Sequence, residues 1–425
     1  MTGALIGIGL LITLSILGVP MIAALIGSVA VGLYLGGQWA LTMPQGMVNG
    51  MSDYTLLSLP LFVLAGVLMN VGGLSARLFD FAHSLVGWMK GGLAQVDVLT
   101  SIFLGGMFGS SAADIAGTGS ITIPAMKRAG YSPAFAAATC ASSSGVGPML
   151  PPSSPMILYS AVTGTSLGAL FLAGIIPGIL MGLVFMGVVF WLARRHNFPR
   201  HGDLSWLEIW TTLRGAFLSI GMPAIIVGGT SVGVFTPTEG SAFGVVYAAA
   251  LSVFYRSLNL KSFYRACLAA VQLSGELLLM VGLSGTLGAS LASAHVPQAI
   301  ASMIDVIAIG DSDFMRLAAL MLLAVLAGMF LDPLIPVLVP VILPTLLAFN
   351  IDLIQFGILM VMAVVIGQLH PPIGIASIIA GRIAGVDQVQ VFRANVPFFV
   401  AIIGFTIVLM AVPELSTWLP NYLKD

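Results

Sequence analysis

Two short segments of this chain interrupt apolar sequence and leave backbone oxygens without helical partners. Residues 147–152 read Gly-Pro-Met-Leu-Pro-Pro, and residues 367–372 read Gly-Gln-Leu-His-Pro-Pro. Each proline pair lacks two backbone donors and stops a helix, so the carbonyl oxygens before it lose their helical partners. Such oxygens, together with hydroxyls, suit a dehydrated Na⁺ ion, and the N-terminus of the following half-helix suits an anion. The expected chemistry is therefore the binding of ions at interrupted helices.

Hydroxyl and acidic residues near the two interruptions supply the other candidate ligands. Ser110 and Ser111 lie in one apolar stretch, and Asp332 lies in the middle of another. We predict one Na⁺ site between these serines and the first interruption, and a second between Asp332 and the second interruption. The predicted Na⁺ ligands are Ser110, Ser143, Gly147, Leu150, Asp332, Gly367 and His370. The predicted substrate contacts are Ser111, Pro152, Ser153 and Ser154, and no organic cofactor is expected.

Several polar residues also have a purely structural interpretation. Asp332 could cap the helix that follows it, and for Asp114 a helix cap is preferred over an ion ligand. His370 could contribute its ring or only its backbone carbonyl. Glu239 follows Thr-Pro-Thr and is interpreted as a helix start. Glu276 lies deep in an apolar run and is left open between a charge partner and a neutral core residue.

The composition is that of a polytopic, all-α membrane protein. Hydrophobic residues make up 58% of the 425 residues, charged residues make up 7%, and the mean hydropathy is +1.08. Soluble proteins carry about a quarter charged residues. The net charge of −1 indicates no nucleic-acid partner. The sequence contains neither an H-E-x-x-H motif nor a phosphate-binding loop, so no enzyme is indicated. The chain is therefore expected to lie in a lipid bilayer.

Apolar runs of roughly 17–25 residues predict membrane-spanning helices. They lie at about 3–18, 20–37, 55–73, 131–162, 167–193, 215–233, 236–255, 266–294, 353–384 and 396–413. The runs 131–162 and 353–384 contain the interruptions and are predicted to be broken helices. Two further apolar stretches, 92–126 and 314–349, have polar or proline residues at their centres and are too long for one span. We predict that these two stretches form re-entrant helical hairpins.

The two halves of the chain share this pattern. Pro124 and Pro151 recur as Pro344 and Pro371, each 220 positions later (344 − 124 and 371 − 151). Paired interrupted helices in corresponding halves are typical of transporters that bind ions and substrate between two repeats.

Charged residues beside the predicted hairpins indicate the orientation of each half. The residues around the first hairpin are basic, namely Arg77, Lys90, Lys127 and Arg128. The residues around the second are mostly acidic, namely Asp305, Asp311, Asp313 and Asp352. Because basic residues stay in the cytoplasm, the base of the first hairpin is predicted inside and that of the second outside, with both termini external. The halves then form an inverted repeat. In the alternative, the hairpins are ordinary spans. Basic residues would then lie on both sides of the membrane, which is the reason to prefer hairpins.

The predicted domain boundaries follow from this arrangement. Scaffold helices are expected at 1–90 and 215–312. Transport parts are expected at 91–165, with hairpin 92–128 and broken helix 131–162, and at 313–385, with hairpin 314–349 and broken helix 353–384. Residues 166–214 are expected to be a connecting helix and cytoplasmic loop, and residues 386–425 a last helix and external tail.

Six motifs, in order along the chain, resemble one transporter family. They are LGVPMIAAL (17–25), GGLAQVDVLTSIFLGGMFGSSAAD (91–114), SITIPAMKRAGYSPAFAAATCASSSGVGPMLPPSSPMILY (120–159), FTPTEGSAFGVVYA (235–248), GMFLDPLIPVLVPVILP (328–344) and FGILMVMAVVIGQLHPPIG (356–374). Together they resemble the large membrane subunit, of the DctM type, of tripartite ATP-independent periplasmic (TRAP) transporters. That family commonly carries Thr where this chain has His370, which argues against hydroxyl ligation at this position.

The resemblance implies an elevator-type transporter of the ion-transporter group in a bacterial or archaeal inner membrane. Its partners would be a small four-helix membrane subunit, expected as a separate chain, and a periplasmic substrate-binding protein. Two or more Na⁺ ions would drive the uptake of an organic acid. C4-dicarboxylates, sialic acid and other sugar acids, keto acids and compatible solutes all fit.

Two other functions stay open at this point. A stand-alone Na⁺/organic-anion symporter of the same hairpin-containing group would need neither partner. Neighbouring genes for a small subunit and a binding protein would separate it from a TRAP subunit. An intramembrane enzyme is the third reading, and the predicted spans offer it no nucleophile and base pair.

Overall fold

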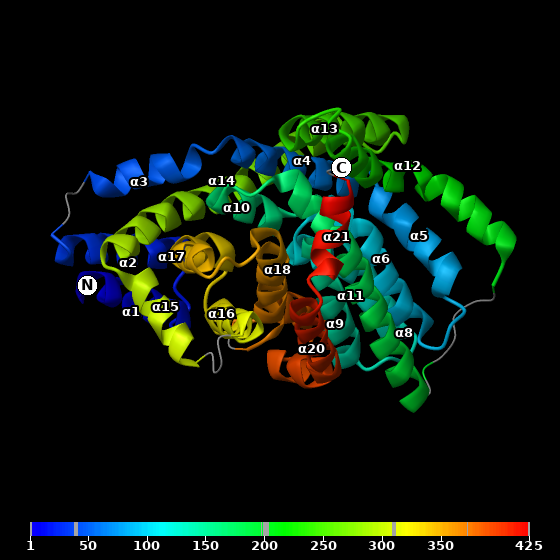
Figure 1. Ribbon diagram of the computed structural model, residues 1–425. Helices are drawn as coiled ribbons and strands as arrows, with labels where there is room; N and C mark the ends of the chain where they lie inside the picture. The colour runs from blue at the N-terminus through cyan, green and yellow to red at the C-terminus, as the bar shows by residue number, and fades with distance from the viewer. Residues whose placement is uncertain are drawn as a thin grey trace.

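The computed structural model describes residues 2–37, 41–196, 198, 204–307, 312–371 and 373–423, and all regular structure in this part is helical (Figure 1). Five of its helical segments are long and apolar enough to cross a membrane. They are Tyr54–Val71, α11 (Leu167–Arg195), α12 (Trp206–Ser231), α14 (Leu260–Ser293) and α20 (Gln388–Ala411). Most of the other helices are shorter, which fits a chain whose hairpins and interrupted helices take the place of full spans.

The periphery is formed by helices from the start and the middle of the chain. These are α1 (Thr2–Ile16), α2 (Met21–Leu35), α3 (Thr42–Met51), the short turn η1 (Tyr54–Leu57), α4 (Ser58–Val71), α5 (Leu74–Val86), α13 (Pro237–Phe254) and α15 (Val296–Ile307). α1 packs on α2 at the left of Figure 1, and α2 and α3 contact α14. α4 packs on α13, and α5 packs on α12. These contacts join the predicted scaffold segments of both halves.

Several helices depart from the predicted spans. α3, α5, α15 and α21 (Glu414–Tyr422) are additional to them. α5 buries Leu74, Leu78 and Phe81 on one face and exposes Asp80, and such an amphipathic helix contains no continuous apolar run. α12 and α14 begin earlier than predicted, because Ser205 and Asn259 cap them.

A helix–turn–helix unit lies at each predicted hairpin. In the first half, α6 (Gly92–Phe108) leads to a turn at Gly109. The chain then returns through α7 (Ser111–Asp114), a π-helical turn η2 (Ile115–Gly119) and α8 (Ser120–Arg128). In the second half, α16 (Asp313–Gly328) returns as α17 (Leu334–Ala348). In each unit the two arms contact one another.

Both predicted broken helices are interrupted where the proline pairs lie. α9 (Pro133–Ser143) passes into the 3₁₀ turn η3 (Ser144–Met149), and α10 (Ser154–Thr163) starts after an extended segment. α18 (Leu353–Leu369) ends before His370, and α19 (Ile375–Ala384) starts after Gly374, whose φ of 44° is left-handed. Each interruption thus divides one predicted broken helix into two shorter helices.

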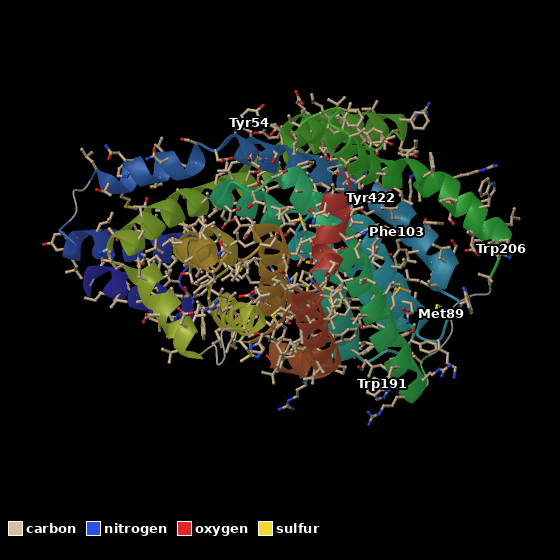
Figure 2. The ribbon with its side chains drawn as sticks, viewed as in Figure 1. Tyr54, Met89, Phe103, Trp191, Trp206 and Tyr422 are labelled. Carbon is tan, nitrogen blue, oxygen red and sulfur yellow. The ribbon has the colours of Figure 1, made fainter. Side chains whose placement is uncertain are left out.

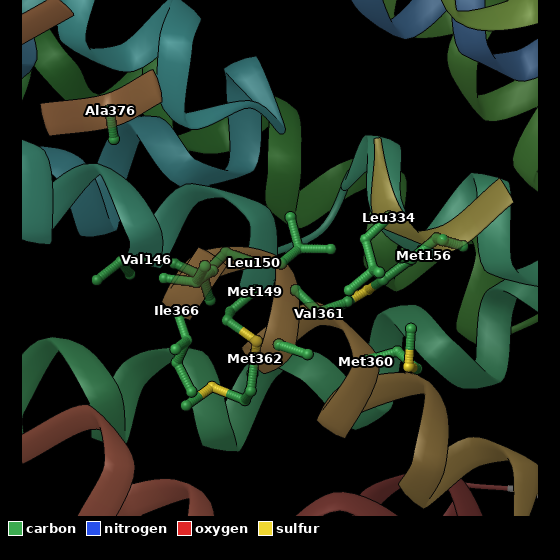
Figure 3. Packing of buried hydrophobic residues seen from close by; sticks show 14 of the residues in the cluster. Val146, Met149, Leu150, Met156, Leu334, Met360, Val361, Met362, Ile366 and Ala376 are labelled. Carbon is green, nitrogen blue, oxygen red and sulfur yellow. The ribbon is translucent and has the colours of Figure 1, made fainter. Parts of the chain in front are cut away.

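The two halves of the molecule pack reciprocally around these interruptions. α9 packs on α19, and α10 packs on α17 and α18. α20 contacts α9, and its counterpart α11 contacts α18. The first part of each broken helix therefore lies beside the second part of the other, so the two helices pass in opposite directions. Figure 3 shows side chains of both halves interlocking there, with Met149, Leu150 and Met156 facing Leu334 and Val361.

Exposed aromatic residues lie at the ends of several apolar helices. Tyr54, Trp191, Trp206 and Tyr422 are more than half exposed, and the first three lie at the margin of the molecule in Figure 2. Rings at helix ends suit the headgroup level of a bilayer.

Candidate ion and substrate site

The tip of the first hairpin touches the first interruption directly. The backbone N–H of Ser154 donates to the carbonyl oxygen of Gly109 at 3.3 Å. Gly109 has a φ of 56°, and a Cβ on it would lie 2.7 Å from the carbonyl oxygen of Pro152. Only glycine fits this contact. The predicted pair of tip serines and the predicted substrate segment are thus held at one place.

The hydroxyls at this place differ in what they can still bind. Ser111 is 2% exposed, and its Oγ has no hydrogen-bond partner in the described structure. Ser153 Oγ donates to the carbonyl oxygen of Pro148 at 2.5 Å and accepts from the N–H of Met156 at 3.4 Å, which caps α10. Of the predicted substrate contacts, Ser111 therefore has a free buried hydroxyl, whereas the Ser153 hydroxyl already holds the loop together.

Backbone geometry is the same at the two interruptions. Leu150 has φ and ψ of −98° and 135°, and His370 has −97° and 135°. The N–H of Leu150 donates to the Gly147 carbonyl at 3.2 Å, and the N–H of His370 donates to the Gly367 carbonyl at 3.3 Å. Each glycine carbonyl thus keeps one lone pair for another ligand. Because the side chains at 150 and 370 differ, the repeated feature is the backbone.

Close backbone contacts hold each hairpin against its interruption. A Cβ on Gly105 would lie 3.1 Å from Gly147 Cα, and a Cβ on Gly367 would overlap the carbonyl oxygen of Gly328. In both halves the first hairpin arm therefore crosses the broken helix where two glycines meet.

A small cavity lies between the second tip and the second interruption. It offers about 10 Å³ to the centre of a water-sized sphere, which is room for one water or one small ion. Its lining is Gly328, Leu331, Asp332, Leu334, Val364, Gly367, Gln368, Ile373, Gly374 and Ile375. Asp332 makes no capping hydrogen bond to α17, and among the described residues no basic group forms an ion pair with it. The cavity brings Asp332 and Gly367 together, as in the predicted second Na⁺ site.

A family profile described as the tripartite ATP-independent periplasmic transporter, DctM component, matches residues 8–415. The chain belongs to the DctM family. It is accordingly a multi-pass bacterial membrane permease and not an enzyme.

Individual members of the DctM family are similar to this chain over most of its length. The chain is 35% identical over 373 residues to the C4-dicarboxylate TRAP transporter large permease protein DctM of Pseudomonas aeruginosa, with 87% of each chain covered. It is 32% identical over 415 residues to the 2,3-diketo-L-gulonate TRAP transporter large permease protein YiaN of Escherichia coli, covering 93% of this chain and 96% of YiaN.

The third relative is longer than this chain. The match to the sialic acid TRAP transporter permease protein SiaT of Haemophilus influenzae is 32% identical over 386 residues. It covers 89% of this chain, which spans 62% of the length of SiaT. The fold resembles that of the Alcanivorax borkumensis YdaH transporter, with a TM-score of 0.60, 13% identity and 88% of both chains covered.

Two acidic residues of this DctM-family chain make contacts that were not predicted. Asp114 does not cap its helix; it ends α7, and its Oδ1 accepts from Thr118 Oγ1 at 3.0 Å. The cap interpretation of Asp114 is therefore wrong. Ser143 turns its hydroxyl away from the interruption and donates to Asp97 Oδ2 at 2.8 Å. Sequence reasoning missed Asp97, although an acid inside an apolar run is itself a signal of function.

The remaining predicted residues lie as follows. The His370 ring packs between Phe392 and Phe399 of α20, with ring centroids 5.2 Å away in both cases, and its Nδ1 contacts the Pro371 carbonyl. Its neighbour Pro372 is outside the described residues. Glu239 accepts from the N–H of Thr236 at 2.7 Å in a capping box, so its interpretation as a helix start is confirmed.

Proposed function

We propose that this chain is the large, substrate-translocating subunit of a Na⁺-driven TRAP transporter that imports an organic acid. Family membership supports the subunit assignment. The three relatives named above carry sialic acid, C4-dicarboxylates and 2,3-diketo-L-gulonate in their names, and all of these substrates are carboxylates. The observation that carries Na⁺ coupling is the repeated backbone geometry at the two interruptions.

The first Na⁺ ion would bind between the first tip and the first interruption. Its proposed ligands are the backbone carbonyls of Gly147 and Leu150 and the tip residue Ser110. The second would bind in the small cavity beside Asp332, with the Gly367 and His370 carbonyls. A single carboxylate opposite one Na⁺ balances the charge there, which suits a site inside a membrane.

The substrate carboxylate would bind beside the first tip. Ser111 offers a buried hydroxyl without a partner, and Ser154 begins α10, whose N-terminus favours an anion. Pro152 and Ser153 would shape this site through their backbone, since the Ser153 hydroxyl is already bonded.

The hairpins and broken helices would move as one unit in an elevator mechanism. Their reciprocal packing supports this proposal. Lys127 Nζ, at the base of the first hairpin, donates to the Ala384 carbonyl at the end of α19 at 2.7 Å, which ties the two halves together. We infer that both hairpins are re-entrant and that the first opens toward the cytoplasm and the second outward. The peripheral helices would form the scaffold.

The proposed partners are a small membrane subunit and a periplasmic binding protein. One feature of α14 supports a membrane partner. Glu276 lies 16 residues from its start and 17 from its end (276 − 260 and 293 − 276), is exposed, and has no hydrogen-bond or ion-pair partner among the described residues. Val271 and Leu273 beside it are 68% and 46% exposed. A carboxylate at this depth in lipid is costly, so a helix with a polar or basic residue would cover it.

A stand-alone Na⁺/organic-anion symporter is the second candidate, because the hairpins and interrupted helices that carry the proposed ion sites all belong to this one chain. Both candidates are tested by uptake into proteoliposomes of the purified chain, with and without the small subunit and binding protein. The proposal predicts uptake of a carboxylate only with an inward Na⁺ gradient and all three components. Uptake by the chain alone supports the symporter, and gradient-independent uptake contradicts both.

A further inference from the structure

A second group of oxygen atoms lies inside the first hairpin, away from its tip. Asp97 is on α6, 12 residues before Gly109, and Thr122 is on α8, 13 residues after it (109 − 97 and 122 − 109). At 1.5 Å per residue, both lie about 18 Å below the tip and face one another across the hairpin. Ser143 of α9 joins them, and each of the three side chains is at most 1% exposed.

The Asp97 carboxylate has too few partners for a buried charge. Its Oδ2 accepts from Ser143 Oγ at 2.8 Å, and its Oδ1 accepts no hydrogen bond. Thr122 Oγ1 lies beside this carboxyl but outside hydrogen-bond geometry and has no other partner. Among the described residues, no Lys, Arg or His forms an ion pair with Asp97. A buried carboxylate with one hydrogen bond and no basic partner would be stabilised by a bound cation.

The backbone around this group is irregular in a way that supports a binding site. The π-helical turn η2 lies between Asp114 and Ser120, and π turns are frequent at functional sites. A Cβ on Gly119 in this turn would lie 2.8 Å from Cys140 Sγ of α9, so hairpin and α9 are in direct contact. The Ser143 hydroxyl also donates to the Cys140 carbonyl oxygen at 3.1 Å, and the N–H of Ser144 donates to the same oxygen, so the side-chain oxygens are the ones left for a ligand.

We propose that Asp97, Thr122 and Ser143 bind an additional Na⁺ ion between the first hairpin and α9. One carboxylate and two hydroxyl oxygens match the charge and ligand preference of a monovalent hard cation. Asp114, whose Oδ2 also has no partner, adds negative potential from nearer the tip. The ion would fasten the hairpin to the helix that carries the first interruption. This inference rests on the proposed Na⁺-driven uptake.

The test is equilibrium binding of ²²Na⁺ to the purified full chain. Asp97→Asn is expected to lower the saturating number of Na⁺ ions per chain by one relative to the wild type. Gln95→Met is the matched control, because Gln95 is an equally buried polar residue two positions away on α6 that donates to the Met186 carbonyl instead. It is expected to leave the number unchanged.

Thr122→Val serves as a second variant if Asp97→Asn does not fold. It keeps the carboxylate and is expected to weaken the Na⁺ affinity of one site by about tenfold. Equal stoichiometry in Asp97→Asn and the wild type, or an unchanged affinity in Thr122→Val, overturns the proposal. Loss of a bound proton instead of a bound Na⁺ in Asp97→Asn overturns it too and makes Asp97 a neutral acid. A wild-type chain that binds no Na⁺ contradicts the proposed function itself.

Discussion

At the scale of single residues, the two interruptions show that backbone position rather than side-chain type is repeated. Leu150 and His370 share one conformation, and Gly147 and Gly367 precede them with equivalent hydrogen bonds. The interruptions could be predicted from the sequence because a proline pair marks each of them. The direction in which the Ser143 hydroxyl points could not be predicted from the sequence, because its hydrogen-bond acceptor Asp97 lies 46 residues earlier and on another helix.

Substitution of Ser111 tests the substrate site. Ser111→Leu should abolish uptake at saturating Na⁺, because the larger apolar side chain fills the buried space beside its unpartnered hydroxyl. Arg382→Ala is the comparison, since Arg382 is exposed near the end of α19. Its half-saturation value for substrate should change by less than about threefold, or about 0.7 kcal/mol. Loss of uptake in a folded Arg382→Ala protein would make the arginine the carboxylate anchor.

Substitution of Asp332 tests the second Na⁺ site. Asp332→Ala removes the carboxylate that lines the small cavity, so the Na⁺ concentration for half-maximal uptake should rise by about tenfold or more. Asp80→Ala, on the exposed face of α5, should leave it unchanged. Na⁺ titrations of uptake at fixed substrate measure both. An unaltered Na⁺ dependence in Asp332→Ala would remove this residue from the site.

At the scale of elements, the hairpins and broken helices were predictable, whereas the amphipathic helices were not. Gly109, with its left-handed φ of 56°, and the proline pair at 151–152 end helices, whereas single prolines such as Pro177 and Pro340 lie inside α11 and α17. Helices such as α5 are stabilised by one buried face, which a search for apolar runs does not detect. Re-entry of the hairpins into the membrane stays a prediction.

The glycine crossings give a prediction for these elements. Gly367→Ala should reduce uptake by about tenfold or more, because the added methyl group meets the backbone of Gly328, which cannot turn aside as a side chain can. Gly187→Ala on α11 is the control, since a Cβ there has nothing within 4 Å. Equal uptake and equal melting temperature for both variants would refute the close crossing.

At the scale of the whole molecule, copurification can test the proposed contact between Glu276 and the small subunit. Glu276→Leu should weaken copurification of the small subunit, because it removes the carboxylate that a polar or basic residue of a partner helix would satisfy. Glu414→Leu, at an exposed position of α21, should copurify as the wild type does. Full copurification with Glu276→Leu would place the small subunit elsewhere.

In the proposed inverted repeat the two halves face opposite sides of the membrane, and cysteine labelling can decide whether they do. Arg128 and Asp313 lie exposed at the bases of the first and second hairpins. The background protein should lack Cys140 and Cys267, the two native cysteines. With a membrane-impermeant thiol reagent added to intact cells, Asp313→Cys should be labelled, and Arg128→Cys should be labelled only after the membrane is opened. Labelling of both positions from the same side would contradict the inverted repeat.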